Sequence, residues 1–177
     1  MTPLRLFMDT EFTTLSVNKV LISIGFVSEH DEHSLYLVLD GWSEDQCSTF
    51  VVDTVLPLLD RHGPERLTRA AAAARIETWM DGLRGGDRTI PIIVTTDTAV
   101  DWTLLQQLFV VRPAHNIAHA LIADDVPYQF LGQFFRDVEA YFRLRSTAEQ
   151  PDGEQHHALV DARALKHAWH QRAGGYR

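Results

Sequence analysis

The sequence has little of what secreted and membrane proteins require. It contains one cysteine, Cys47, which excludes an internal disulfide framework and favours a reducing compartment. No basic segment with a following apolar run precedes the first predicted strand, so no secretory signal is indicated. No uncharged apolar stretch approaches the roughly 20 residues of a membrane-spanning helix. We therefore expect a cytoplasmic protein with no membrane partner.

Positive charge is scarce as well. The chain has 16 Lys or Arg against 24 Asp or Glu, a net charge of −8 that would repel a nucleic-acid backbone at long range. The deficit lies in residues 1–125, because residues 126–177 carry seven basic and six acidic side chains. Six basic residues of this C-terminal part could flank a bound strand, although solvated helix faces would also explain them: Arg136, Arg143, Arg145, Arg163, Lys166 and Arg172. Any nucleic acid should bind weakly and in a salt-sensitive way.

Length and hydrophobic patterning predict a single domain over 1–177, because 177 residues with 45% apolar content can build one proper core. Apolar runs over 4–9, 20–28 and 34–39, joined by short polar turns, predict three antiparallel strands. Apolar spacing predicts further elements: helices over 44–61 and 65–83, a strand over 90–95, helices opening near 101 and 131, and a last helix that contains Asp161 and ends before Gly174-Gly175. The segment from Tyr128 could instead begin a fifth strand, with Asp137 as a helix cap.

Two carboxylates, Asp9 and Glu11, end the first apolar run. Side chains at i and i+2 of a strand face the same side, so both can project into one place. Like charges this close raise each other's pKa unless a cation lies between them, and Mg²⁺ or Mn²⁺ is the usual occupant of such a site. An isolated Asp-x-Glu pair is more often a solvated strand end. Here the apolar neighbours Met8 and Phe12 indicate a buried strand.

A further carboxylate, Asp101, stands where a predicted helix begins after the strand over 90–95. Capping or complementing the helix dipole would explain an Asp at this position equally well. Asp97, in the preceding loop, is the competing candidate within the same segment. The sequence therefore leaves open which of the two joins the acidic pair.

The third cluster consists of His156, His157 and Asp161, after a polar stretch that contains Pro151 and Gly153. A histidine five residues before Asp161 would lie on another face of an unbroken helix, so His156 is expected in the entry loop. From there its imidazole could reach a metal-bound water beside Asp161. His157, four residues before Asp161, is the plainer helical pairing, and a histidine-rich helix start is by itself more often a surface feature.

Taken together, these motifs resemble the DEDDh class of 3′-to-5′ exonucleases, which includes ribonuclease T, oligoribonuclease and the proofreading subunit of bacterial replicative polymerases. The likeness is carried by Asp9-x-Glu11, Asp101 at a helix start and His156-x-Ala158-x-x-Asp161-Ala162, in that order. The tetrapeptide Asp-Thr-Glu-Phe followed by Leu21-Ile22-Ser23-Ile24-Gly25 is similar to a small bacterial exoribonuclease subgroup. Many members carry Asn four residues before the second-motif Asp, where this chain has Asp97.

The resemblance implies an α/β, ribonuclease H-like fold: a mixed sheet of three antiparallel strands plus one or two more, with helices packed on its faces. It also implies two Mg²⁺ or Mn²⁺ ions per active site. Asp9 would bridge both ions, Glu11 and Asp161 would hold the ion beside the nucleophile, and Asp101 would support the other. His156 would act as general base, and the products would be nucleoside 5′-monophosphates.

Thr10 and Phe12 are the candidate substrate-binding residues. Phe12 could stack on a base at the 3′ end, although ordinary core packing would also explain an apolar residue at the end of a strand. Leu15, Trp102 and Phe109 are expected in the core.

The expected partner is the 3′ end of single-stranded RNA or DNA, with RNA favoured on the subgroup resemblance alone. Two alternatives remain: a non-catalytic nucleic-acid-binding domain of the same fold, and a hydrolase of free nucleotides or small phosphodiesters. The presence of every acidic position and of the histidine favours the enzyme. A homodimer is a further expectation, because ribonuclease T-like relatives commonly work as dimers.

Overall fold

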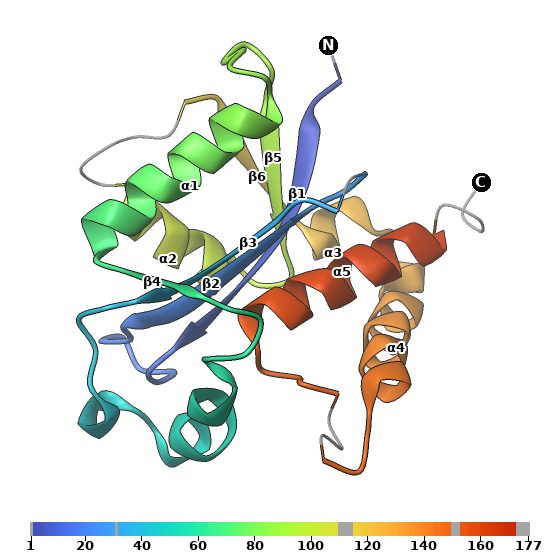
Figure 1. The fold of residues 1–177 in the computed structure, drawn as a ribbon. Coiled ribbons are helices and arrows are strands. Elements are labelled where there is room, and N and C mark those ends of the chain that lie inside the picture. Colours follow the sequence, from blue (N-terminus) through green and yellow to red (C-terminus); the bar gives the residue numbers. More distant parts are fainter. Residues whose placement is uncertain (1, 31, 110–114, 150–152, 173–177) are drawn as a thin grey trace.

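The computed structural model describes residues 2–30, 32–109, 115–149 and 153–172. It is an α/β structure built on one six-stranded mixed sheet, in the order β4-β3-β2-β1-β5-β6, with helices packed on it (Figure 1). This arrangement is compatible with a ribonuclease H-like fold. Within the described part of the chain, none of the helices combines the length and apolar character needed to cross a membrane.

The first three strands form the antiparallel meander that the sequence predicts: β1 (Leu4–Phe12), β2 (Leu21–Ser28) and β3 (Ser34–Leu39). On its other side β1 pairs in parallel with β5 (Ile92–Thr96), and β5 pairs in parallel with β6 (Ile117–Leu121). The site-bearing strand β1 therefore lies inside the sheet and is paired along both edges.

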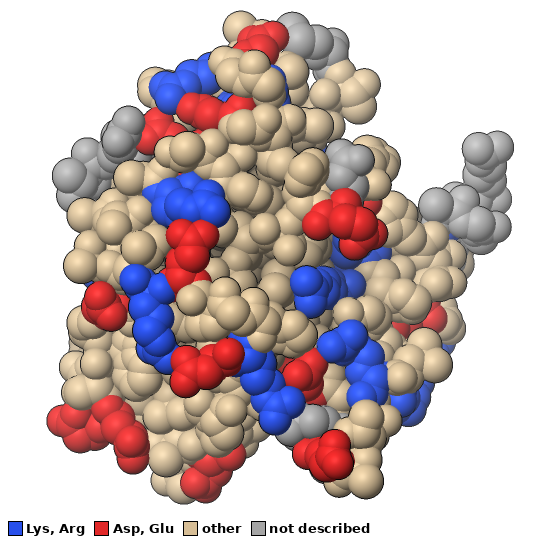
Figure 2. Space-filling model, in the orientation of Figure 1, with Lys and Arg blue, Asp and Glu red and all other residues tan. Residues whose placement is uncertain are grey.

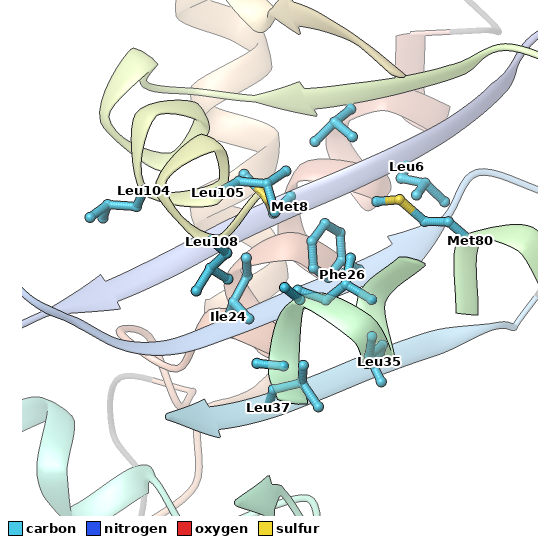
Figure 3. Packing of buried hydrophobic residues seen from close by; sticks show 14 of the residues in the cluster. Leu6, Met8, Ile24, Phe26, Leu35, Leu37, Met80, Leu104, Leu105 and Leu108 are labelled. Atoms are coloured by element: carbon cyan, nitrogen blue, oxygen red, sulfur yellow. The ribbon is translucent and has the colours of Figure 1, made fainter. Parts of the chain in front are cut away.

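The two faces of the sheet carry different helices, α1 (Arg69–Leu83) and α2 (Ala99–Leu108) on one, α4 (Tyr128–Arg145) and α5 (Ala158–Arg172) on the other (Figure 1). On the α1–α2 face, Met80 of α1 and three leucines of α2, Leu104, Leu105 and Leu108, pack against Leu6, Met8 and Phe26 (Figure 3). On the opposite face, Phe7 packs against residues of α4 and α5. Successive β1 side chains thus alternate between the two layers, and all eight residues of β2 are buried.

The chain between β3 and α1 differs from the prediction. In place of one helix over 44–61 it forms three short segments, 3-10 turns at Glu44–Gln46 and Leu56–Leu58 and a π-helical turn at Val51–Val55. Pro57 lies in the first turn of the last segment and has no N–H group to continue a regular helix. The predicted second helix begins at Arg69 rather than 65, because Thr68 caps it and 65–67 forms strand β4 (Glu65–Leu67) beside β3.

The alternative of a fifth strand from Tyr128 is wrong. Tyr128 begins α4, and Asp137 lies inside that helix, where its Oδ1 accepts a hydrogen bond from Gln133 at 2.8 Å. The strand that does extend the sheet there is β6 (Ile117–Leu121), which precedes a short helix, α3 (Ile122–Asp125). With β4, β5 and β6, the meander gains three strands rather than one or two.

Gly25 allows α5 to lie directly on the sheet. A Cβ atom at this position would come within 2.4 Å of the Leu159 backbone nitrogen, so only glycine fits under the first turn of α5. In the sheet register Gly25 is the partner of Asp9 on β1. The close approach at Gly25 therefore places the start of α5, and with it Asp161, beside Asp9.

Candidate metal centre

The predicted site residues line one pocket of about 460 Å³. It lies where the end of β1, the start of α2 and the start of α5 meet. All seven residues singled out from the sequence border it, together with Asp97: Asp9, Thr10, Glu11, Phe12, Asp101, His156 and Asp161. The fold thus brings segments from both ends of the chain into one cavity.

Within the pocket the possible metal ligands form two groups. Glu11, His156 and Asp161 make one, and Asp9, Asp97 and Asp101 make the other. In each group the three ligand atoms lie within 4.8 Å of one another, and either group could hold a metal ion. Asp97 and Asp101 therefore both belong to the acidic cluster, so the fold places both candidates of this segment beside Asp9.

The alternation of β1 explains how its residues divide. Asp9 and Glu11 share the α5 face with Phe7, whereas Thr10 shares the α2 face with Met8. From that face the Thr10 hydroxyl donates a hydrogen bond to Asp101 Oδ1 at 2.6 Å.

Asp101 lies in the first turn of α2, where its charge complements the helix dipole, and it is buried. The hydroxyl of Thr98, the N-cap residue, donates to Asp101 Oδ2 at 2.5 Å. Both carboxylate oxygens of Asp101 thus have a hydroxyl partner, so this residue is held firmly in position.

Two other carboxylates have an oxygen with no such partner. Oδ1 of Asp97 and Oδ1 of Asp161 are buried and accept no hydrogen bond within the described residues. A buried carboxylate oxygen without a donor is costly, and a hard divalent cation is the ligand that would satisfy it. The donor set of the pocket, carboxylates and one imidazole, fits such a cation.

Burial is the main cause that raises the pKa values of the clustered carboxylates. It raises the pKa of Asp9 well above the usual range, and the charges of Asp101, Asp161 and Glu11 raise it further. Burial and Asp101 raise the pKa of Glu11 to about 8. The pKa of Asp161 is also raised well above its usual range, by burial and by Glu11.

Asp97 has its pKa raised to about 6 for the same two reasons, burial and the charge of Asp101. No Lys or Arg is found among the described residues that line the pocket. A cation from solution is therefore the natural means of balancing this negative charge.

His156 lies in the loop before α5, as the sequence predicts, with a left-handed backbone at φ 68°. Its backbone N–H donates to Asp161 Oδ2 at 3.1 Å, and its ring meets the Phe50 ring edge-on with 5.0 Å between centroids. The imidazole borders the pocket next to Glu11 and Asp161.

His157 has a different environment. It is buried, its ring packs 4.3 Å from the Tyr36 ring, and its Nε2 lies 3.4 Å from the Arg61 carbonyl oxygen. Burial lowers its pKa to about 4, and the neighbouring His62 adds to this effect. The expected helical pairing with Asp161 is wrong, because α5 begins only at Ala158 and His157 packs in the core.

The apolar rim of the pocket contains Leu15, which was expected in the core, and Phe50, which was not identified from the sequence. Leu15, expected in the core, is 88% exposed in the turn after β1 and borders the pocket. Phe50, which no motif singles out, borders the pocket and is 53% exposed. Phe12 borders the pocket and also packs against the core. Trp102 and Phe109 pack against the core, as expected.

The basic residues of the C-terminal part lie outside this pocket. Lys and Arg side chains gather over the region of α4 and α5 in Figure 2. Arg163 and Lys166 line a separate pocket of about 280 Å³, and Arg145 is bonded to Glu154. Arg136 and Arg143 bond to neighbours on α4, and Arg172 stacks on Trp169.

No model of a known protein family matches this chain, and no curated protein matches it in sequence.

Proposed function

We propose that this protein is a metal-dependent 3′-to-5′ exonuclease that removes nucleoside 5′-monophosphates from the end of single-stranded RNA or DNA, with RNA favoured. One observation carries the proposal: carboxylates from β1, the start of α2 and the start of α5 converge with His156 in a single pocket. The preference for RNA rests only on the resemblance of the Asp-Thr-Glu-Phe segment to exoribonucleases.

Two divalent cations, Mg²⁺ or Mn²⁺, fit the two ligand groups. Glu11 and Asp161 would hold one, and Asp9 with Asp97 or Asp101 would hold the other. The family resemblance assigns Asp9 to both ions. When bound, such ions lower the pKa of a water molecule and stabilise the leaving 3′ oxygen. Asp101 is fixed by Thr10 and Thr98, so the pocket keeps its shape while the charge within it changes.

His156 would accept the proton of the attacking water as general base. As that proton is removed, the water oxygen bonds to phosphorus and the bond to the 3′ oxygen breaks. The edge-on contact with Phe50 and the backbone hydrogen bond to Asp161 keep His156 at the rim of the pocket. Only neutral imidazole accepts a proton, so activity should rise with pH as the histidine deprotonates.

The rim of the pocket would bind the terminal base. Leu15, Phe50 and Phe12 supply apolar and aromatic surface, which stacks on bases without requiring a particular sequence. Thr10 is buried and its hydroxyl is engaged with Asp101, so it would act on a substrate through that carboxylate. The absence of Lys and Arg from the described lining favours a short or single-stranded end over a duplex, because a duplex binder needs many phosphate contacts.

A nuclease assay tests the proposal. Single-stranded RNA, single-stranded DNA and dinucleotides are incubated with the protein in Mg²⁺, in Mn²⁺ and with a chelator, and the products are separated. Wild type should release nucleoside 5′-monophosphates only with metal. Asp9→Asn should lose the activity, and His156→Ala should lower kcat by about 10²- to 10⁴-fold.

Matched controls are an exposed carboxylate and an exposed imidazole away from the pocket, Asp87→Asn and His30→Ala, which should behave as wild type. Equal hydrolysis by wild type and Asp9→Asn would end the exonuclease proposal. Hydrolysis of free nucleotides or dinucleotides without any attack on longer strands would favour the small-substrate hydrolase instead.

A further inference from the structure

The loop that carries His156 has an unusual backbone. Gly153, Glu154 and His156 all have left-handed conformations, with φ of 63°, 66° and 68°. Residues other than glycine rarely adopt this region, so two of the three positions must be maintained by contacts with the surrounding structure. The backbone conformation of this loop around His156 is therefore maintained by contacts with neighbouring elements.

Glu154 supplies most of those contacts. Its Oε1 accepts a hydrogen bond from Arg61 Nη1 at 3.0 Å, and its Oε2 accepts one from Arg145 Nη2 at 2.8 Å. His62 Nε2 lies 3.2 Å from the same Oε2. Only 15% of the Glu154 side chain is exposed, so these charge-assisted bonds are largely shielded from water.

The three partners come from two separate parts of the fold. Arg61 and His62 lie in the turn before β4, and Arg145 is the last residue of α4. Burial raises the pKa of Glu154, but the hydrogen bonds from Arg145, Arg61 and His62 outweigh burial. The pKa is therefore lowered to about 2. Glu154 is thus ionised at neutral pH and joins three cationic or polar groups at once.

The preceding residue fixes the loop from another side. A Cβ at Gly153 would lie 2.2 Å from the Phe142 carbonyl oxygen, so the Gly153 backbone lies closely against α4. Two residues after Glu154, the His156 N–H is bonded to Asp161. The segment from Gly153 to His156 is consequently held at α4, at the turn before β4 and at α5.

We propose that Glu154 is a positioning residue for His156: by joining Arg61, His62 and Arg145 it fixes the loop that presents the imidazole to the pocket. This inference rests on the proposed function, because it assigns Glu154 a role in the same reaction. Glu154 does not border the pocket and would touch neither substrate nor metal.

The test compares Glu154→Gln with wild type in single-turnover and steady-state assays. The amide keeps the shape of the side chain but removes the charge that joins the two arginines. We expect kcat to fall about 10- to 100-fold, the range in which small misplacements of a catalytic group act. KM and the Mg²⁺ affinity should stay within twofold of wild type, because the ligands and the pocket rim are untouched.

A double variant separates positioning from a general loss of structure. If Glu154 acts through His156, then Glu154→Gln should cause no further fall in kcat when His156 is already Ala. The matched control is Glu65→Gln, which breaks the paired hydrogen bonds between Glu65 and Arg75 on an exposed surface and should leave kcat unchanged. An equal fall of kcat in the presence and absence of the His156 imidazole would overturn the proposal.

Amide hydrogen exchange gives a readout that does not depend on activity. The His156 N–H should exchange faster in Glu154→Gln than in wild type, and it should be unchanged in Glu65→Gln. Wild type without nuclease activity, together with faster exchange in Glu154→Gln, would remove the proposed function but keep Glu154 as the residue that holds the loop. Unchanged kcat and unchanged exchange in Glu154→Gln would remove the positioning role alone.

Discussion

Asp101 and Asp97, four residues apart, meet the pocket in different ways. Asp101 accepts a hydroxyl hydrogen bond at each oxygen, while Oδ1 of Asp97 accepts none within the described residues. A carboxylate whose oxygens both accept hydrogen bonds keeps its orientation. A carboxylate with an oxygen that lacks a donor is stabilised more by binding a cation. We therefore expect Asp97 to matter for metal affinity, although the motif of the resembling enzymes emphasises Asp101.

Thr10→Val tests the support of Asp101. Valine has nearly the shape of threonine but cannot donate to Asp101 Oδ1, so a buried carboxylate loses one of its two hydroxyl donors. Loss of a hydrogen bond to a charged group should lower the free energy of unfolding by about 1.5–3 kcal/mol, measured by urea denaturation. Mg²⁺ affinity should fall by about 10- to 100-fold in a calorimetric titration.

Thr103→Val is the matched control for that change, because the Thr103 hydroxyl bonds only to a carbonyl oxygen on the exposed side of α2. It should leave Mg²⁺ affinity as in wild type. If Thr10→Val bound Mg²⁺ as tightly as Thr103→Val, the Thr10 bond would have no part in the metal centre.

The pKa of Glu11 predicts how stability depends on pH in the metal-free protein. This pKa rises from 4.5 to about 8 on folding, mainly through burial. The protonated form is therefore favoured in the folded state: the stabilisation is complete below pH 4.5 and is lost as the pH rises to about 8. The melting temperature without metal should fall across that window.

Glu11→Gln should flatten that fall, because the amide does not ionise, and it should be more stable than wild type without metal at pH 8. Mg²⁺ should stabilise wild type more than the variant at that pH, because the variant keeps only the ligand group of Asp9, Asp97 and Asp101 intact. Thermal melts of both proteins with and without chelator measure this, with the exposed Glu149→Gln as control. Parallel pH profiles for wild type and Glu11→Gln would show that Glu11 is not the group responsible.

At the level of elements, the site depends on how closely α5 approaches β2. Gly25 leaves room for the first turn of α5, and that turn carries Asp161. On the other face, α2 is tied to the strand by the bond between Thr10 and Asp101. The metal centre is therefore assembled from both layers of helices across one strand.

Gly25→Ala should push α5 away from β2 and so disturb the metal centre. The added methyl group would lie 2.4 Å from the Leu159 nitrogen, so α5 must move away from the sheet. We expect a loss of about 1–3 kcal/mol in unfolding free energy, as for other overpacked positions, and a marked loss of nuclease activity.

The control is Gly82→Ala in α1, where an added Cβ meets nothing within 4 Å and should instead stabilise the protein by about 0.5–1 kcal/mol. Wild-type activity in Gly25→Ala would contradict the role given to this contact.

Elements with strong and local signals could be predicted from the sequence, and those defined by tertiary contacts could not. The meander and the helix after His157 follow from apolar runs and polar turns. Strand β6 and the short strand β4 are fixed by pairing with β5 and β3, which a local pattern does not encode. Leu15 is exposed for a related reason, because a turn residue is buried only if another element covers it.

The candidate site was easier to predict than its surroundings. Asp9 with Glu11 and His156 with Asp161 lie in compact motifs whose spacing indicates their chemistry. Phe50 carries no such signal, since its place beside the pocket depends on the path of the chain between elements.

For the whole molecule, a net charge of −8 and a pocket lined by carboxylates disfavour nucleic acid unless cations are bound. Binding of a single-stranded oligonucleotide should therefore require Mg²⁺ or an inert divalent analogue such as Ca²⁺. Because few basic side chains lie near the pocket, one or two phosphates should be neutralised, giving a slope of about −0.7 to −1.4 in log affinity against log salt. Fluorescence anisotropy with Asp9→Asn as control measures this, and tight metal-free binding would show that another surface binds the strand.

Because β1 is paired along both edges, insertions and deletions within it would disrupt the site. Asp9 and Glu11 face α5 only because β1 keeps its register with β2 and β5. One residue inserted or deleted within β1 before Asp9 would rotate both carboxylates to the opposite layer, where apolar side chains of α1 and α2 fill the space. The turn over 13–20 lies beyond both carboxylates, so a change of length there would leave them in place and alter the pocket rim at Leu15 instead.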